Sequence, residues 1–116
     1  MKIIQPKYLL KSLTNVGLVA RPNSDLILHV RRIEKALRAY GVSLHVEENS
    51  ALMLGMDGGL SLDALGEKCD MLISLGGDGT LISVCRRTYM YAKPILGIHA
   101  GQLGFLTNVR LDEIES

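Results

Sequence analysis

The stretch Met71-Leu72-Ile73-Ser74-Leu75-Gly76-Gly77-Asp78-Gly79-Thr80 joins a short apolar run to a turn of three glycines around one aspartate. The apolar run has the length and composition of a buried strand. The next residues carry apolar or small side chains three and four positions apart, which predicts a helix. These helix positions are Leu81, Val84, Cys85 and Thr88. A strand, a glycine turn and a helix in this order can bring backbone N–H groups to a phosphate, with Asp78 at the tip of the turn.

The Asp-Gly pair in this turn is also a hairpin signal. A hairpin needs a second strand after the turn, however, and the spacing of the following apolar residues is helical. We therefore favour the strand–turn–helix interpretation.

Length and charge indicate one globular domain with a single core. The chain has 116 residues, 47% of them apolar, and its formal net charge is +1. The basic pairs Arg31-Arg32 and Arg86-Arg87 are isolated, so we expect no nucleic-acid partner. No apolar run reaches about 18 residues, and the amino-terminal segment is too short and broken for a signal peptide. We expect a cytoplasmic protein that does not enter a membrane.

The cysteines and histidines do not indicate a metal site. Cys69 and Cys85 form no paired motif, which is typical of reduced thiols in the cytosol. The three histidines (29, 45 and 99) are scattered rather than clustered, so we expect no metal bound by these side chains.

Upstream of the glycine turn, the chain predicts a strand, a helix and a second strand. Residues 15–20 predict the first strand, and Ser24 or Asp25 can cap the helix that follows. One face of this helix is apolar, with Gly41 in the position of a carboxyl-terminal cap. The face consists of Leu26, Val30, Ile33, Leu37 and Tyr40. Residues 42–46 alternate as a second strand with His45 on its exposed side, and the whole unit predicts parallel pairing with a right-handed crossover.

The region between the second strand and the central stretch is less regular. We expect a short helix at 51–54, a loop at 55–59 and a capped turn at 61–65. The letters Asp57-Gly58-Gly59 resemble the later motif, but they follow no strand and open no clear helix. We interpret them as a flexible connection.

Downstream, residues 94–98 predict a fourth strand, followed by a glycine-rich segment at 99–108. The expected fold is an open, mostly parallel, doubly wound α/β sheet of the Rossmann-like kind, in which sites lie at the carboxyl ends of the strands. Both glycine-rich segments should then face one crevice. Residues 111–116 begin another predicted helix, and the chain stops inside it, which suggests a fragment.

The two glycine-rich segments together resemble the amino-terminal domain of the NAD kinase family. The resemblance rests on two segments, Leu75-Gly76-Gly77-Asp78-Gly79-Thr80-Leu81 and Gly97-Ile98-His99-Ala100-Gly101-Gln102-Leu103-Gly104-Phe105-Leu106-Thr107. The first motif is shared with diacylglycerol and sphingosine kinases and, in related form, with phosphofructokinases. The second motif is much more specific, and the PxGTxND-type segment of the lipid kinases is absent. The resemblance covers most of residues 15–110.

The resemblance implies transfer of the γ-phosphoryl group of ATP, or of polyphosphate, to the 2′-hydroxyl of the adenosine ribose of NAD, which yields NADP. It implies Mg²⁺ or another divalent cation, and Asp78 as the general base; whether Asp78 acts as base, metal ligand or both stays open. Phe105 would pack against adenine. The implied nucleotide-contacting residues are Gly76, Gly77, Asp78, Gly79, Thr80, His99, Gly101, Leu103, Gly104 and Phe105.

The chain also departs from the family pattern. The Asn-Glu/Asp substrate motif and the β-rich second domain are missing, so we expect residues 1–116 alone to be inactive and prone to self-association. The full-length protein is expected to be a dimer or tetramer. Some members have a basic residue where Ser83 stands; Arg86 or Arg87 could compensate or could be plain exposed helix residues. His99 replaces a common Asn and either lines the ligand or caps the loop.

Two other functions remain open at this point. One is a lipid kinase of the diacylglycerol or sphingosine type, and the other is a regulatory module that binds a nucleotide without catalysis. A NAD-dependent dehydrogenase is disfavoured, because no GxGxxG motif follows the first predicted strand.

Overall fold

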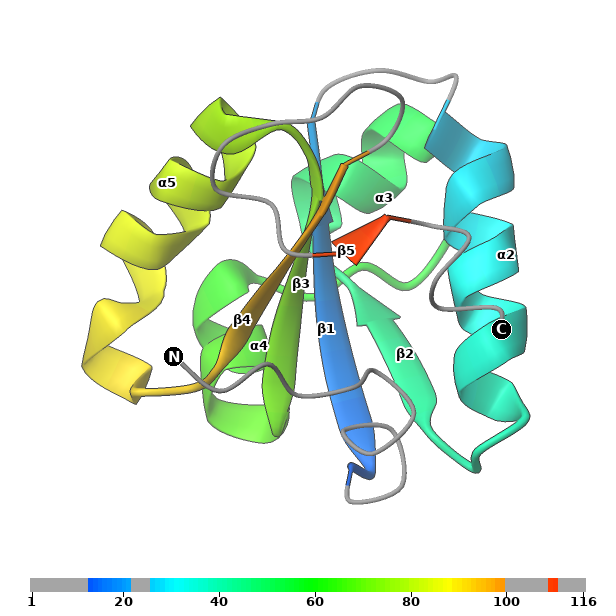
Figure 1. Ribbon diagram of the computed structural model, residues 1–116, viewed down its shortest axis with the longest axis horizontal. Helices are drawn as coiled ribbons and strands as arrows, with labels where there is room; N and C mark the ends of the chain where they lie inside the picture. The colour runs from blue at the N-terminus through cyan, green and yellow to red at the C-terminus, as the bar shows by residue number, and fades with distance from the viewer. Residues whose placement is uncertain (1–12, 22–25, 100–108, 111–116) are drawn as a thin grey trace.

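The computed structural model describes residues 13–21, 26–99 and 109–110, and these residues form a parallel five-stranded sheet with the order β2-β1-β3-β4-β5 (Figure 1). The strands are β1 (Asn15–Ala20), β2 (Ser43–Val46), β3 (Met71–Gly76), β4 (Ile95–His99) and β5 (Val109–Arg110). The helices are α2 (Ile27–Arg38), α3 (Glu48–Leu54), α4 (Leu62–Lys68) and α5 (Asp78–Thr88), with a 3-10 turn η2 at Tyr89–Tyr91. The predicted strand at 15–20 is confirmed, and those at 42–46, 71–75 and 94–98 are confirmed to within one residue.

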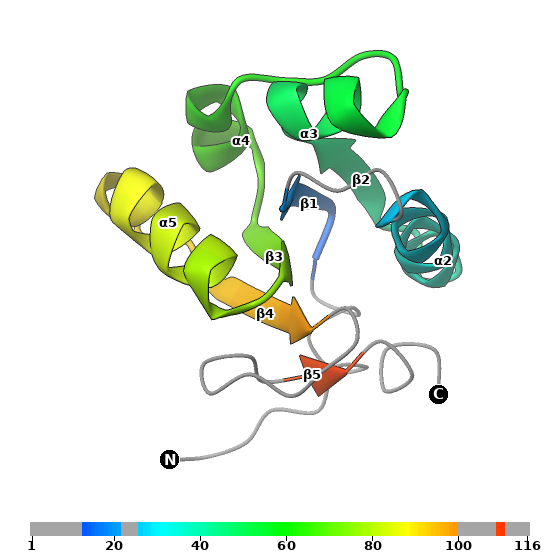
Figure 2. The ribbon, with the colours of Figure 1, turned by 90° about the horizontal axis from the view of Figure 1, so that it is seen from above.

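Helices cover both faces of the sheet. Viewed from above, α2 lies on one face, and α4 and α5 lie on the other (Figure 2). Side chains of β3 alternate between the two cores: Met71, Ile73 and Leu75 join the core under α2, and Leu72 joins the core under α4 and α5. Every residue of β3 is buried, as expected for a central parallel strand covered on both sides. The predicted doubly wound arrangement is confirmed.

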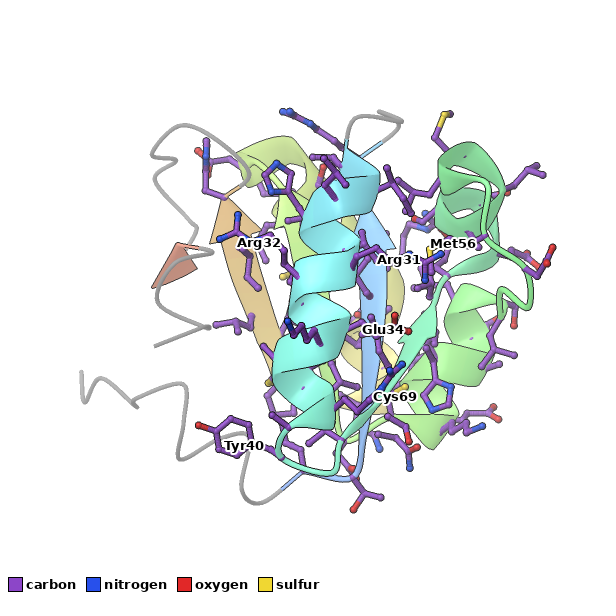
Figure 3. All side chains as sticks on the ribbon, turned by 90° about the vertical axis from the view of Figure 1, so that its right-hand side faces the viewer. Arg31, Arg32, Glu34, Tyr40, Met56 and Cys69 are labelled. Atoms are coloured by element: carbon purple, nitrogen blue, oxygen red, sulfur yellow. The ribbon has the colours of Figure 1, made fainter. Side chains whose placement is uncertain are left out.

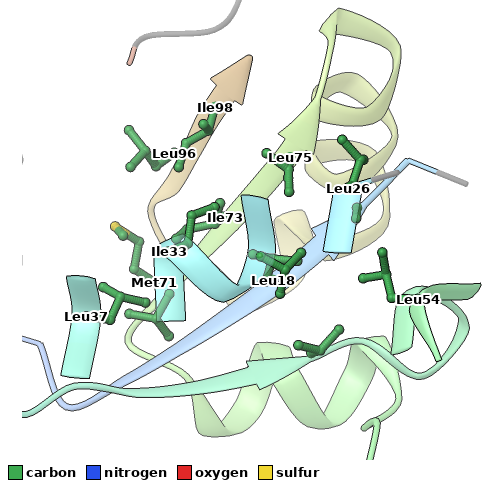
Figure 4. Packing of buried hydrophobic residues seen from close by; sticks show 14 of the residues in the cluster. Leu18, Leu26, Ile33, Leu37, Leu54, Met71, Ile73, Leu75, Leu96 and Ile98 are labelled. Carbon is green, nitrogen blue, oxygen red and sulfur yellow. The ribbon is translucent and has the colours of Figure 1, made fainter. Parts of the chain in front are cut away.

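The core under α2 is formed by the apolar helix face that the sequence predicts, with one exception. Leu26, Ile33 and Leu37 are buried against the sheet (Figure 4), but Tyr40 is 37% exposed. The helix ends at Arg38, and the chain reverses at Gly41, whose φ is +74°. The prediction for Tyr40 is wrong because this reversal carries its side chain beyond the end of the helix (Figure 3). The predicted caps Ser24 and Asp25 lie outside the described residues.

The two cysteines have different environments. Cys69 is buried in the second core, and burial raises the pKa of its thiol to about 11, so the thiol stays protonated and acts as an apolar side chain. Cys85 is exposed and lies on α5, the helix that its spacing from Leu81 and Thr88 predicts. That helix is confirmed, and its buried residues are Leu81, Val84 and Thr88, so Cys85 lies outside the contact with the sheet.

Polar side chains tie the amino ends of the strands together. The Asp70 carboxylate accepts hydrogen bonds from the backbone N–H groups of Thr14 (3.0 Å) and Asn15 (2.9 Å), and these bonds lower the pKa of that carboxyl. His45 Nε2 lies 2.9 Å from Asn15 Oδ1. The prediction that His45 is simply exposed is wrong: the side chain is half-buried, and burial, followed by the charge of Lys68, lowers its pKa.

The region between β2 and β3 contains two short capped helices. The predicted short helix is confirmed as α3, and the predicted capped turn is confirmed as α4, whose N-cap Ser61 accepts a bond from Ala64 N–H at 3.1 Å. Within the described part of the chain, none of the helices combines the length and the apolar character that a bilayer span requires.

A buried hydrogen-bond network joins the start of α3 to the end of β1. The Glu47 carboxylate accepts bonds from the N–H groups of Asn49 (2.8 Å) and Ser50 (3.0 Å) and from the Ser50 hydroxyl (2.9 Å). The same hydroxyl accepts a bond from Ala20 N–H at 3.0 Å. The end of β1 is therefore held in place by α3.

Replacing Ser50 by Ala should destabilise the protein by about 1–3 kcal/mol, because it leaves the buried N–H of Ala20 without this acceptor. Urea unfolding of the full-length protein measures the loss. Ser43→Ala, at an exposed position of β2, is the control and should change stability by less than about 0.5 kcal/mol. Equal effects of the two substitutions would contradict the role of the network.

The lowered pKa of His45 predicts a stability that depends on pH. The unfolded chain takes up a proton near pH 6.5, whereas the folded chain does so only at lower pH, so stability is lost as the pH falls below about 6.5. A His45→Gln variant lacks this titration. Chemical unfolding between pH 7.5 and 5.5 should show a smaller loss of stability in the variant than in the wild type; identical losses would refute the prediction.

Candidate functional site

The glycine turn joins the carboxyl end of β3 to the amino end of α5. Gly77 precedes the helix in an extended conformation (φ −150°, ψ −164°) and makes no side-chain cap, while Asp78 is the first helical residue. The first N–H groups of a helix have no acceptor within the helix, and they carry part of the positive end of its dipole. The turn therefore offers backbone donors suited to a phosphate oxygen.

The three glycines of the turn differ in whether the fold requires glycine at their position. Gly76 has φ +154°, and a methyl group at its Cα would lie 3.0 Å from Thr80 Oγ1 and 3.1 Å from Arg21 Cβ. The fold therefore needs glycine at this position. Gly77 and Gly79 have open space around their Cα atoms and no positive φ. Nothing in the described fold requires them to be glycine, and their missing side chains leave the turn open to a ligand.

A groove of about 370 Å³ opens beside this turn. Its walls come from α5 and from α3, and its floor is the end of β1. The described residues that line it are Val19, Ala20, Arg21, Glu47, Asn49, Ser50, Met53, Gly79, Thr80, Ser83, Val84 and Arg87.

The groove combines positive charge with hydroxyl groups. Arg21 contributes a guanidinium from the end of β1, and Arg87 contributes another from α5. The Glu47 carboxylate also lines the groove, but it is 5% exposed and both of its oxygens accept hydrogen bonds from α3. With Thr80 and Ser83 along α5, the groove presents the cations and hydroxyl groups that a chain of phosphates requires.

His99 lies next to the turn, as the last residue of β4. It pairs with Gly76 in the sheet, and strand alternation places it on the same face as α5, because Leu96 and Ile98 belong to the core under α2. Its Nδ1 atom is buried and has no hydrogen-bond partner among the described residues. The two roles predicted for His99, lining a ligand or capping the loop, both remain predictions.

The structure brings together only part of the predicted site. Gly76, Gly77, Asp78, Gly79 and Thr80 form the turn, and His99 lies beside it. The predicted residues Gly101, Leu103, Gly104 and Phe105 lie outside the described residues, as does the helix predicted at 111–116. Among the described residues, no group of three or more His, Cys, Asp or Glu side chains could hold a metal ion.

Sequence reasoning missed most of the groove, since only Gly79 and Thr80 of its described lining were predicted as nucleotide contacts. Arg21, Glu47 and Met53 were not predicted as site residues, although they line the groove with the turn. For Arg21 a signal existed, because it directly follows a predicted strand and the carboxyl ends of parallel strands meet at one edge. For Met53, on a short helix with no predicted contact to the turn, the sequence gives no such signal.

Comparison with known proteins identifies relatives along most of the chain. Residues 16–116 match the family model described as ATP-NAD kinase N-terminal domain. The NAD kinase of Sulfurimonas denitrificans is 44% identical over 91% of this chain and 37% of that protein. The NAD kinase of Wolinella succinogenes is 45% identical over 100% of this chain and 39% of that protein. The chain thus spans less than two fifths of the length of these curated relatives.

One solved structure supports the fold independently. It is described as the crystal structure of yeast NADH kinase complexed with NADH, and it superposes with a TM-score of 0.61. The match covers 87% of this chain and 33% of the yeast chain, at 22% sequence identity. Similarity at this level confirms the fold.

Alanine substitutions should separate the two kinds of glycine. Gly76→Ala should destabilise the protein by about 1–3 kcal/mol, because alanine is strained at this φ and meets Arg21 and Thr80. Gly79→Ala should leave stability unchanged or raise it by up to about 1 kcal/mol, since alanine is the better helix former. It should nevertheless weaken the binding of inorganic tripolyphosphate.

Thermal unfolding and titration calorimetry of the full-length protein measure the two effects. A Gly79→Ala protein that unfolds at a lower temperature than Gly76→Ala would contradict this division.

Proposed function

Because this chain belongs to the NAD kinase family, we propose that the full-length protein transfers the γ-phosphoryl group of ATP, or of polyphosphate, to the 2′-hydroxyl of the adenosine ribose of NAD. The product is NADP. The observation that carries this proposal is the glycine turn with Asp78, which opens onto a cationic groove at the carboxyl end of the central strand. Family membership favours this reaction over the lipid kinase considered from the sequence.

Phosphoryl transfer needs mainly positioning and neutralisation of charge. The backbone donors at the start of α5 would hold the terminal phosphate, and Arg21 would offset its charge from the floor of the groove. The open positions at Gly77 and Gly79 allow the phosphate and the ribose to approach the backbone closely.

Asp78 would act as the general base. As the bond forms between the ribose 2′-oxygen and the γ-phosphorus, the bond from that phosphorus to the bridging oxygen breaks and ADP leaves. The proton of the 2′-hydroxyl passes to the Asp78 carboxylate. A positioned carboxylate of this kind contributes about 10²–10⁴-fold to the rate.

A divalent cation would enter with the donor. Mg²⁺ is commonly held by substrate phosphates together with one or two carboxylates, so it needs no cage built from protein side chains alone. Asp78 is the acidic residue of the turn, which suits this mode. Bound Mg²⁺ would supply neutralisation of the phosphate charge.

The acceptor would bind partly through the second glycine-rich segment. Gly101, Leu103, Gly104 and Phe105 are proposed to contact NAD, with the Phe105 ring against adenine and His99 lining the same ligand. We propose a cytoplasmic enzyme that forms a dimer or tetramer. Residues 1–116 alone should be inactive, because they span less than two fifths of the relatives.

Replacing Asp78 by Asn should lower kcat for NADP formation by about 10²–10⁴-fold while NAD binding is retained, because the amide keeps the shape of the side chain but accepts no proton. The assay follows NADP formed from NAD and ATP with Mg²⁺ by the full-length protein. Asp57→Asn is the matched control, since Asp57 also precedes a glycine but is exposed in a loop and is not among the described residues that line the groove. It should leave kcat unchanged.

Two results would contradict the proposal. A wild-type protein that binds nucleotide without forming NADP would indicate the regulatory module considered from the sequence. Phosphorylation of diacylglycerol or sphingosine in vesicles, with no NADP formed, would indicate a lipid kinase.

A further inference from the structure

The apolar residue Met53 of α3 lines the groove, and packing in the core does not explain its position. Met53 is 45% exposed, although Ala51 and Leu54 of the same helix are buried in the core. A large apolar side chain that remains open to solvent inside a groove favours a ligand with an apolar face.

Arg87 lines the same groove from the opposite helix. It follows Gly79 by eight residues, so it lies about 12 Å further along the axis of α5, at about 1.5 Å per residue. Thr80 and Ser83 line the groove between them. A phosphate chain that begins at the glycine turn would pass these hydroxyl groups, and the portion of the donor beyond the phosphates would reach Arg87.

We propose that Met53 and Arg87 form the subsite for the base of a nucleotide donor. The inference rests on the proposed function for the position of the transferred phosphate at the turn. A guanidinium stacks on the face of a flat aromatic ring, and a thioether sulfur makes favourable contacts with one. A bare polyphosphate has no ring, so this subsite selects a nucleotide over polyphosphate.

The chain offers a matched control for each residue. Leu52 is the neighbour of Met53 in α3 and is 80% exposed, and it is not among the described residues that line the groove. Arg86 is the neighbour of Arg87 in α5, is also exposed, and likewise is absent from that lining. Any general effect of removing an exposed methylene or a positive charge would therefore appear in the controls as well.

The test is titration calorimetry of the full-length protein with the β,γ-imido analogue of ATP and with inorganic tripolyphosphate. Met53→Ala should weaken binding of the analogue about threefold, and Arg87→Ala about five- to tenfold. Both variants should bind tripolyphosphate within about twofold of the wild type. Leu52→Ala and Arg86→Ala should bind both ligands as the wild type does.

Arg87→Lys adds a second measurement for the case in which an alanine variant folds poorly. It keeps the charge but loses the planar group, so it should weaken binding of the analogue and leave tripolyphosphate binding unchanged. Equal losses for both ligands would overturn the inference, because Arg87 would then bind phosphate. Equal effects of the control substitutions, or no binding of the analogue by the wild type, would also overturn it.

The same titrations separate this inference from the proposed function. If the protein binds the analogue with the expected dependence on Met53 and Arg87 yet forms no NADP, the base subsite is supported and the proposed reaction is contradicted. If the protein forms NADP but shows none of these differences in binding, the proposed reaction is supported and the base subsite is contradicted.

Discussion

The parallel pairing of β1 with β3 is the constraint on which the site depends. The pairing continues one residue beyond β1, where Arg21 N–H donates to the Leu75 carbonyl at 3.0 Å. This bond places the Arg21 side chain against the Cα of Gly76, so a cation lies directly beside the glycine turn. A shift of one residue in the register would move Arg21 to the other face of the sheet and remove that cation from the groove.

The two helices that line the groove, α5 and α3, contribute to it in different ways. The first turn of α5 faces the groove with backbone donors, while its buried residues Leu81 and Val84 fix it on the sheet. The helix α3 is short, and its amino end is capped by the buried carboxylate of Glu47. The oxygens of that carboxylate accept hydrogen bonds from α3, and the two arginines that line the groove outnumber it. Fold and site thus share residues, and a substitution in the Glu47–Ser50 network acts on both.

Local sequence patterns predicted the elements well and the site only in part. The strand at 71–75, the glycine turn and the helix after it could be predicted because each depends on neighbouring residues. Tyr40 was misplaced because a periodic pattern does not reveal where a helix stops touching the sheet. The groove could not be derived, since Met53 and Arg87 line it together only through the packing of two helices from distant segments.

The hydrogen bonds that Asp70 accepts at the amino ends of β1 and β3 have a consequence for the order of folding. The bonds from Thr14 and Asn15 to Asp70 join residues 56 and 55 positions apart. Contacts of such separation form late, because the loop between them must close first at an entropic cost. During synthesis, β1, α2 and β2 emerge before β3, so their apolar faces cannot be fully buried until the central strand is present. The groove is lined by residues of β1, α3 and α5, so it forms only once β3 has paired with β1 and α5 has packed on the sheet. Phosphate binding should therefore follow these long-range contacts rather than precede them.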